Sequence, residues 1–154
     1  MHDGMTEFAI IVATRDRAVA LQRLLASAVA MADWERLMPE IIVVDDGPSD
    51  ANRFVVADVA RRTPGVRYLP VRAGGKTRAL NQGIRATQAR LLAFVDDDVE
   101  LDAGWLVAVA AYASHARFEA AQGAVRLPPE SAGDPAVIAA IAGARFHAAI
   151  SVPA

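Results

Sequence analysis

The chain has 154 residues, of which 54% are hydrophobic, and its formal net charge at pH 7 is −2. This length suits one domain with a substantial core, and the slight negative charge gives no electrostatic basis for binding nucleic acid. The absence of cysteine excludes disulfides and thiolate catalysis, and no apolar run reaches the ~18 residues of a membrane span. The first residues lack the basic and apolar regions of a signal peptide, so the default expectation is a cytoplasmic protein.

Short apolar segments alternate with segments of helical periodicity along the chain. Three short, continuous apolar runs predict buried strands; they are 8–13, 41–44 and 91–95. Segments 66–69 and 121–127 predict two further strands. Segments in which apolar residues recur every three or four positions predict helices; they are 19–28, 50–62, 74–87, 102–114 and 135–149. This alternation predicts an α/β domain with a mostly parallel sheet flanked by helices.

Ligands of parallel α/β sheets bind beyond the carboxyl ends of the strands. Polar and charged residues follow each of the first four predicted strands, so we expect them to converge on one crevice. They are Thr14, Arg15 and Asp16; Asp45 and Asp46; Arg72, Gly74, Gly75 and Lys76; and Asp96, Asp97 and Asp98. This convergence is a stronger indication of a ligand site than any one of the four clusters.

Three consecutive aspartates, Asp96 to Asp98, end the fourth predicted strand. Two unit charges at ~4 Å repel each other by ~4 kcal/mol near a protein surface, so a compensating cation is expected. Mg²⁺ and Mn²⁺ prefer carboxylate oxygen and often hold substrate phosphates through one or two carboxylates. The alternative interpretation is a solvated acidic turn that caps the next helix.

The other clusters suit a phosphorylated ligand. Lys76 and Arg72 would neutralise phosphate, and the carboxylates of Asp45 and Asp46 can only accept hydrogen bonds, as from a nucleobase or ribose. Alternatively, Gly74-Gly75 is a plain loop and residues 45–47 form a turn before a capped helix. An NTPase P-loop is excluded because Pro70 stands where the pattern before Gly75-Lys76-Thr77 requires glycine.

Four stretches of the chain resemble, in order and spacing, the nucleotide-binding half of family 2 glycosyltransferases with the GT-A fold. The stretches are IIVATRDR (10–17), EIIVVDDGPSD (40–50), GGKTRALNQGI (74–84) and FVDDD (94–98). The resemblance covers roughly residues 7–127. It departs from the family pattern after the first strand, where Ala-Thr-Arg-Asp-Arg replaces the common Pro-Thr-Tyr-Asn-Arg.

The resemblance implies a role for each matching position. Nucleotide-sugar contacts would come from Thr14 and Asp45 at the nucleobase, with Asp46 nearby, from Arg15 and Lys76 at the phosphates or base, and from Asp96 and Asp97 near the ribose. Asp96 to Asp98 match the DxD motif, in which Asp96 and Asp98 would ligate Mn²⁺ or Mg²⁺ on the diphosphate. A UDP-sugar is the first candidate donor.

The resemblance therefore implies the donor domain of an inverting, metal-dependent glycosyltransferase, with residues 1–127 as the donor-binding core. Residues 128–154, a proline-rich turn and helix, would begin an acceptor-binding half that the chain does not complete. We assign no catalytic base, which is expected beyond the chain end. The acceptor (a glycan, a lipid or a small molecule) is unknown. The longer parent protein could lie at the cytoplasmic face of a membrane, and exposed apolar surface leaves a homodimer open.

Three other interpretations stay open. The chain could be a non-catalytic module that binds nucleotide sugars, because it lacks an identifiable base. A sugar-nucleotide nucleotidyltransferase is a second enzyme class, although such enzymes carry a glycine-rich loop after the first strand and residues 14–17 contain no glycine. An α/β domain with an acidic rim and no ligand would require all four clusters to be coincidental.

Overall fold

The computed structural model describes residues 7–72, 74–115, 121, 123 and 150–151 of the chain. Strands and helices alternate along the main part of these residues, as predicted. The strands are β1 (Phe8–Thr14), β2 (Glu40–Asp45), β3 (Val66–Pro70), β4 (Leu91–Asp96) and β5 (Ile150–Ser151). The helices are α1 (Ala18–Val29), α2 (Trp34–Leu37), α3 (Ala51–Ala60), α4 (Lys76–Arg85) and α5 (Trp105–His115).

The strands form one sheet in the order β3-β2-β1-β4-β5. The first four are parallel, and β5 pairs with β4 in the antiparallel direction. The register places Thr14 beside Asp45 and Ala13 beside Asp96, so three strands end at nearly the same level. The predicted mostly parallel α/β sheet is thereby confirmed, and its polar strand ends lie along one edge.

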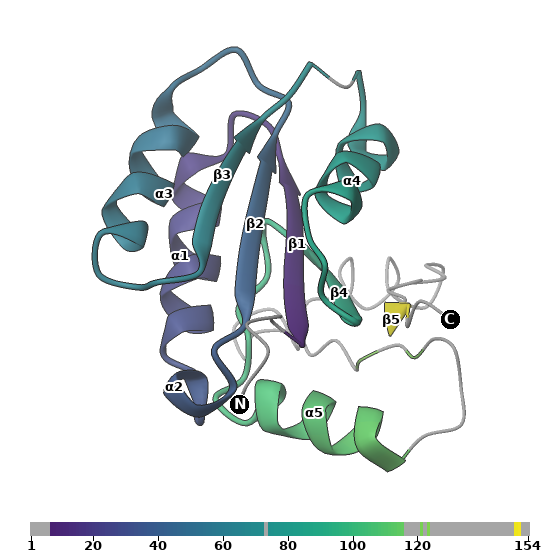
Figure 1. Ribbon diagram of the computed structural model, residues 1–154. Helices are drawn as coiled ribbons and strands as arrows, with labels where there is room; N and C mark the ends of the chain where they lie inside the picture. The colour runs from purple at the N-terminus through teal and green to yellow at the C-terminus, as the bar shows by residue number, and fades with distance from the viewer. Residues whose placement is uncertain (1–6, 73, 116–120, 122, 124–149, 152–154) are drawn as a thin grey trace, which may run out of the picture.

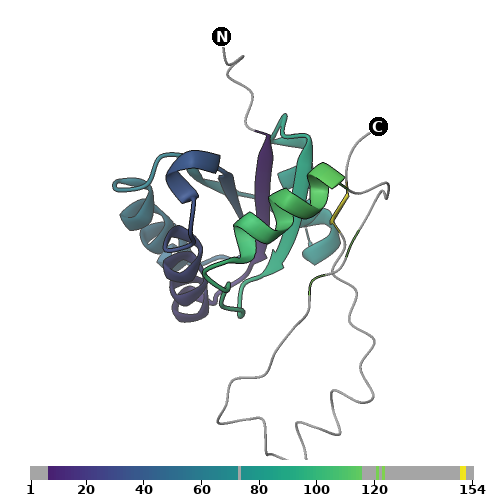
Figure 2. The ribbon, with the colours of Figure 1, turned by 90° about the horizontal axis from the view of Figure 1, so that it is seen from below.

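Helices cover both faces of the sheet (Figure 1). Successive side chains of a strand point to opposite faces, so each buried strand supplies two hydrophobic layers. Ile10 and Ile41 belong to the layer that also contains Leu24 of α1, Val56 of α3 and Leu106 of α5. Alternate strand residues form the second layer, against α4; this layer includes Ile11, Ile42, Val44 and Ala79. Figure 2 shows α5 running across β1, on the face whose hydrophobic layer includes α1 and α3.

Helix α4 packs closely on the sheet because one of its inward positions is glycine. A Cβ atom at Gly83 would lie 2.5 Å from Cγ2 of Ile11 and 3.0 Å from Cγ2 of Val44. Such separations are shorter than van der Waals contact, so a side chain would push the helix away from the strands. The same helix begins at Lys76, and its packing therefore determines how near this lysine lies to the strand ends.

The structure differs from the sequence prediction at several places. The one-turn helix α2 was not predicted; it lies between Asp33 and Met38, both of which have positive φ. Of the strand predicted at 121–127, the described residues Ala121 and Gly123 lie in no strand, and the remainder lies outside the described residues, as does the helix predicted at 135–149. The antiparallel strand β5 was not predicted. Among the described helices, none has both the length and the apolar character to cross a membrane.

Candidate functional site

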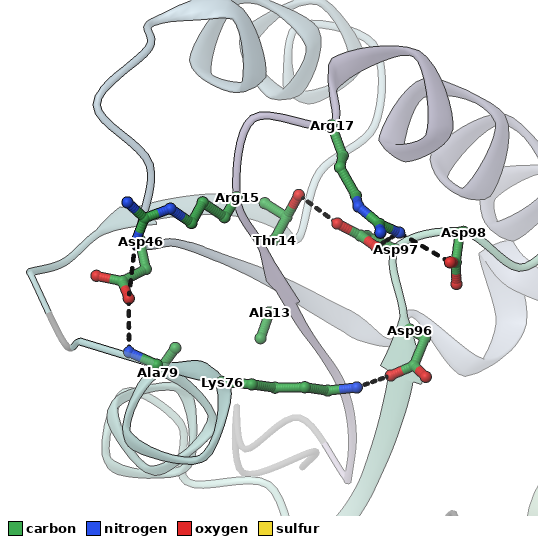
Figure 3. A pocket seen from close by; sticks show the side chains of 11 residues that line it. Ala13, Thr14, Arg15, Arg17, Asp46, Lys76, Ala79, Asp96, Asp97 and Asp98 are labelled. Carbon is green, nitrogen blue, oxygen red and sulfur yellow. Dashed lines mark hydrogen bonds and ion pairs between the residues drawn. The ribbon is translucent and has the colours of Figure 1, made fainter.

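A pocket of about 400 Å³ opens at the carboxyl ends of β1 and β4, beside the first turn of α4 (Figure 3). β2 and β3 lie on one side of β1 and β4 lies on the other, so the pocket stands where the strand order reverses. This is the position at which open parallel sheets bind ligands, and the volume is typical of small-molecule sites. The lining residues are Ala13, Thr14, Arg15, Arg17, Asp46, Gly75, Lys76, Ala79, Asp96, Asp97 and Asp98.

Asp97 is the buried member of the three aspartates, with 7% of its surface exposed. Its Oδ2 accepts a hydrogen bond of 2.7 Å from the hydroxyl of Thr14, which is itself buried. Its Oδ1 lies 3.4 Å from Nη1 of Arg17. A buried carboxylate requires such partners, because an unpaired charge in the interior is strongly unfavourable. These bonds connect the end of β1 to the turn after β4.

Arg17 also pairs with Asp98, whose Oδ2 lies 2.8 Å from the same Nη1 atom. The hydrogen bond to Asp98 and the charges of both aspartates raise the pKa of the Arg17 guanidinium. One arginine thereby compensates two of the three neighbouring carboxylates. The side chains of Arg17 and Asp98 are both more than half exposed, so solvent and ligands can reach this pair.

The third aspartate of the cluster is compensated from the opposite wall of the pocket. Nζ of Lys76, at the start of α4, forms an ion pair with Oδ1 of Asp96 (Figure 3). Arg15 contributes another positive charge, and its Nη1 lies 4.0 Å from Oδ2 of Asp46. Acidic and basic groups from four different segments therefore alternate around the opening.

Asp46 faces the amino-terminal end of α4. Its Oδ2 accepts a hydrogen bond of 2.8 Å from the backbone N–H of Gly75, and its Oδ1 accepts a longer one of 3.3 Å from Gly74. Both glycines have positive φ, at 71° and 131°, a region that other residues avoid. A carboxylate is favourable at this position because the helix amino terminus carries partial positive charge.

Asp45 points to the other face of the sheet and is 1% exposed. Its Oδ1 accepts hydrogen bonds from the Gly47 backbone at 3.0 Å and from Nδ2 of Asn52 at 3.1 Å, and its Oδ2 accepts one of 2.8 Å from the Tyr68 hydroxyl. Burial and this bond to Asp45 raise the pKa of Tyr68 to about 12. Asp45 does not line the pocket.

The structure thus gathers most of the residues that the sequence singles out. Thr14, Arg15, Asp46, Lys76 and the three aspartates 96–98 line one pocket, whereas Asp45 and Arg72 do not. Arg17 lines the pocket although it was not among the predicted site residues. Its position in the polar turn 14–17, just after the first strand, was the available signal. Which of the lining residues touch a ligand stays a prediction.

The residues that could hold a divalent cation are the exposed aspartates Asp96 and Asp98. Their carboxylate oxygens are the ligands that Mg²⁺ and Mn²⁺ prefer, and Mg²⁺ is commonly held by only one or two carboxylates together with substrate phosphates. Among the described residues, no three acidic, histidine or cysteine side chains form a ready metal cluster. The two carboxylates therefore suit a cation whose remaining ligands come from a phosphorylated molecule.

Comparisons with known proteins agree with this architecture. The glycosyl transferase family 2 profile matches residues 9–135. A relative is the uncharacterised glycosyltransferase EpsJ of Bacillus subtilis (strain 168), 37% identical over 59 residues, which are 38% of this chain and 17% of EpsJ.

Solved structures share the fold at low sequence identity. The mannosyltransferase PcManGT of Pyrobaculum calidifontis, in complex with GDP-Man and Mn²⁺, has a TM-score of 0.68 at 21% identity, over 79% of this chain and 36% of its own. S. aureus TarS 1-349 in complex with UDP-GlcNAc has a TM-score of 0.65 at 19% identity, over 78% and 37%. The chain thus spans little more than a third of these structures.

The mostly parallel sheet and the helices on its two faces match the GT-A fold of these neighbours. The family profile covers most of the chain. The protein therefore belongs to glycosyl transferase family 2.

Proposed function

We propose that this chain is the donor-binding portion of an inverting, metal-dependent glycosyltransferase that uses a nucleotide-diphosphate sugar. The observation that carries this proposal is the pocket at the reversal of strand order, in which basic and acidic side chains alternate. A diphosphate needs positive charge, whereas a ribose or nucleobase needs hydrogen-bond acceptors and donors. The pocket offers both within about 400 Å³.

The basic groups are placed to bind the diphosphate. Arg17 and Lys76 reach the aspartate cluster from opposite sides, paired with Asp98 and Asp96. Both side chains are more than half exposed, so each can exchange its carboxylate partner for a phosphate oxygen without being drawn from the core. Arg15, which is 63% exposed, is a third candidate for this role.

The acidic groups divide into an orienting residue and candidate metal ligands. Asp97 is buried against Thr14 and Arg17, so it would hold the turn after β4 in place. It also lines the pocket, where it would accept a hydrogen bond from a ribose hydroxyl. Asp98 and Asp96 are exposed and would hold Mn²⁺ or Mg²⁺. A bound cation of this kind neutralises the charge that develops on the leaving diphosphate.

Asp46 is the acidic residue at the other end of the pocket, beside Gly74 and Gly75. We assign it, together with Thr14, to the nucleoside. An ionised carboxylate accepts hydrogen bonds and donates none, so Asp46 favours a base or sugar that presents an N–H or O–H group. A UDP-sugar is our first candidate donor. The complexes of TarS with UDP-GlcNAc and of PcManGT with GDP-Man and Mn²⁺ support a nucleotide sugar and a divalent metal as the ligand class.

We place the donor-binding unit in residues 1–127. The chain spans 36% of PcManGT and 37% of TarS 1-349, and we propose that the catalytic base and the acceptor site lie in a region that corresponds to the unmatched part of these neighbours. The chain alone is therefore expected to bind the donor, and transfer is to be measured on the longer protein.

Ligand-dependent thermal unfolding tests the proposal. UDP, GDP and dTDP would be added with and without Mn²⁺ to the wild type, to Asp98→Ala and to the control Asp58→Ala, which removes a surface carboxylate on α3 paired with Arg61 and Arg62. A ligand at 100 times its dissociation constant adds about 2.7 kcal/mol of stability, which raises the melting temperature by several degrees.

We expect one nucleotide to raise the melting temperature of the wild type and of Asp58→Ala in the presence of Mn²⁺, and Asp98→Ala to lose the metal-dependent part. A folded wild type that responds to none of the three nucleotides would contradict a donor site. A shift of equal size in Asp98→Ala would leave nucleotide binding intact but remove Asp98 as a metal ligand.

A further inference from the structure

The two adjacent aspartates at the end of β2 lie in different environments. Asp45 lies two and four residues after Val43 and Ile41, so its side chain is on the same face of β2 as theirs. Val43 and Ile41 belong to the hydrophobic layer under α1 and α3. Asp46 follows Asp45 and faces α4 and the pocket. Because successive side chains of an extended strand point to opposite faces, the chain can present only one of this pair to a ligand on the α4 side.

Asp45 is surrounded by donors that belong to the protein. It accepts from the backbone of Gly47 in the following loop, from Asn52 in α3 and from Tyr68 in β3. Its backbone carbonyl also accepts a hydrogen bond of 2.9 Å from Val71, just after β3. Four links thus converge on one residue and hold three separate segments together.

This arrangement fixes the loop that carries Asp46. The N–H of Asp46 donates to the Thr14 carbonyl at 3.1 Å, and the bond from Gly47 to Asp45 closes the turn on the other side. A Cβ at Gly47 would lie 2.9 Å from Oδ1 of Asp16 and 3.0 Å from Oδ1 of Asp45, so the turn is packed as well as hydrogen-bonded. With the loop held at both sides, the Asp46 carboxylate remains against Gly74 and Gly75.

The side-chain amide of Asn52 donates a hydrogen bond to Asp45, and its own oxygen is left without a partner among the described residues. Asn52 is fully buried. An unsatisfied buried acceptor is unfavourable, because it loses its hydrogen bonds to water without replacement. The amide is nevertheless oriented so that Nδ2 donates to Asp45, because a hydrogen bond to a buried carboxylate is stronger than one to a neutral group.

We propose that Asp45 is a positioning residue, which holds the carboxylate of Asp46 in the pocket without contacting the nucleoside itself. This inference rests on the proposed function and deepens it. It revises the expectation from the resemblance, in which Asp45 would contact the nucleobase directly.

The substitution Asp45→Asn separates the two roles. An asparagine can keep Oδ1 toward Gly47 and Asn52, and its Nδ2 can donate to the Tyr68 oxygen, since a phenol accepts as well as donates. The positioning network then survives with one bond reversed. A direct contact to a nucleobase would not survive, because the ligand's donor would meet an amide or lose its charged acceptor.

The main experiment measures binding of UDP, GDP and dTDP, each with Mn²⁺, by isothermal titration calorimetry. We expect Asp45→Asn to bind within about threefold of the wild type and Asp46→Asn to bind about tenfold or more weakly, as loss of a charge-assisted hydrogen bond predicts. The matched control is Asp50→Asn, an exposed aspartate on the same loop whose Oδ1 lies 3.5 Å from Arg53; it should bind like the wild type. A loss in Asp45→Asn as large as that in Asp46→Asn would overturn the proposal.

A second measurement does not depend on nucleotide binding. The backbone amide resonances of Gly74 and Gly75 report the position of the Asp46 carboxylate. We expect Asp45→Ala, or Tyr68→Phe if that variant does not fold, to shift these resonances, and Asp45→Asn to leave them near their wild-type positions. Unchanged glycine amides in Asp45→Ala, or in Tyr68→Phe where that variant replaces it, would contradict a positioning role. Failure of the wild type to bind any nucleotide, with the glycine shifts as expected, would instead count against the proposed function.

Discussion

Arg17 and Asp98 come from the ends of two different strands and form an ion pair in which Nη1 lies 2.8 Å from Oδ2. The same nitrogen lies 3.4 Å from Oδ1 of Asp97. Arg17 is therefore the counter-ion of two of the three carboxylates that follow β4. A divalent cation at Asp98 would compete with it, and a diphosphate would give the displaced guanidinium a new partner.

The first prediction concerns this competition. In Arg17→Gln, Mn²⁺ no longer has to displace a cation from Asp98, so its affinity for the nucleotide-free protein should rise about two- to fivefold, the range that an exposed ion pair of up to about 1 kcal/mol allows. Nucleotide affinity should fall in the same variant. Electron paramagnetic resonance of free Mn²⁺ measures the first effect and calorimetry the second. Arg36→Gln, which breaks an exposed pair with Asp33 away from the pocket, is the control; equal Mn²⁺ affinity in all three proteins would refute the prediction.

The second prediction concerns the buried bond between Thr14 and Asp97. Thr14→Val keeps the shape of the side chain but removes the donor to Oδ2 of Asp97. The free energy of unfolding should fall by about 1–3 kcal/mol, since a buried charged acceptor loses a partner. Urea denaturation at neutral pH measures the change. Thr63→Val, in the turn before β3, should alter stability by less than about 0.5 kcal/mol; a similarly small effect at Thr14 would show that solvent replaces the lost bond.

The third prediction concerns the contact of α4 with the sheet. Gly83→Ala places a methyl group 2.5 Å from Cγ2 of Ile11, and the strain should lower the free energy of unfolding by about 1–3 kcal/mol, less the gain of up to about 1 kcal/mol that alanine brings to a helix. Because α4 carries Lys76, nucleotide binding should weaken as well. Gly104→Ala, which meets no atom within 4 Å, is the matched control in denaturant unfolding. Equal stability of the two variants would mean that α4 can move without loss.

The fourth prediction concerns stability at high pH. Tyr68 has a pKa of about 12 in the folded protein, against 10.0 for an ordinary tyrosine. Between these values the unfolded chain releases a proton that the folded protein retains, so the unfolded state binds fewer protons and stability falls as pH rises. The contribution of Tyr68 is complete below pH 10 and is lost by about pH 12.

Unfolding by urea at several pH values from 9 to about 12 checks this, as the difference between the wild type and Tyr68→Phe. The difference in stability should shrink across this window. An absorbance titration of Tyr112→Phe, which leaves Tyr68 as the only tyrosine of the two in the chain, gives the pKa directly. A midpoint near 10 would show that the hydroxyl is not held by Asp45.

Much of the fold follows from patterns that are local in the sequence. Short segments separated by helical periodicity predict β1 to β4 to within one or two residues. For β1, β2 and β4 the signal is a continuous apolar run, because a strand buried on both faces must be apolar throughout; β3 contains the exposed Arg67 and is recognised only as a short strand between turns. The helices α1, α3, α4 and α5 are predicted by apolar residues that recur every three or four positions. The site as a whole was also predictable, since parallel strands place their carboxyl ends at one edge and the charged residues follow those ends.

What the tertiary structure decided is the direction of individual side chains and the partners they meet. Neighbouring aspartates look equivalent in the sequence, yet the pleat of β2 buries Asp45 against Tyr68 and turns Asp46 to the pocket. Arg17 enters the site because the strand order brings β4 beside β1, so that the turn after one strand meets the aspartates after the other. The amino-acid sequence by itself determines which residues are polar and where the strands end. Which of them face each other depends on strand order and register, and these arise only from the packing of distant segments.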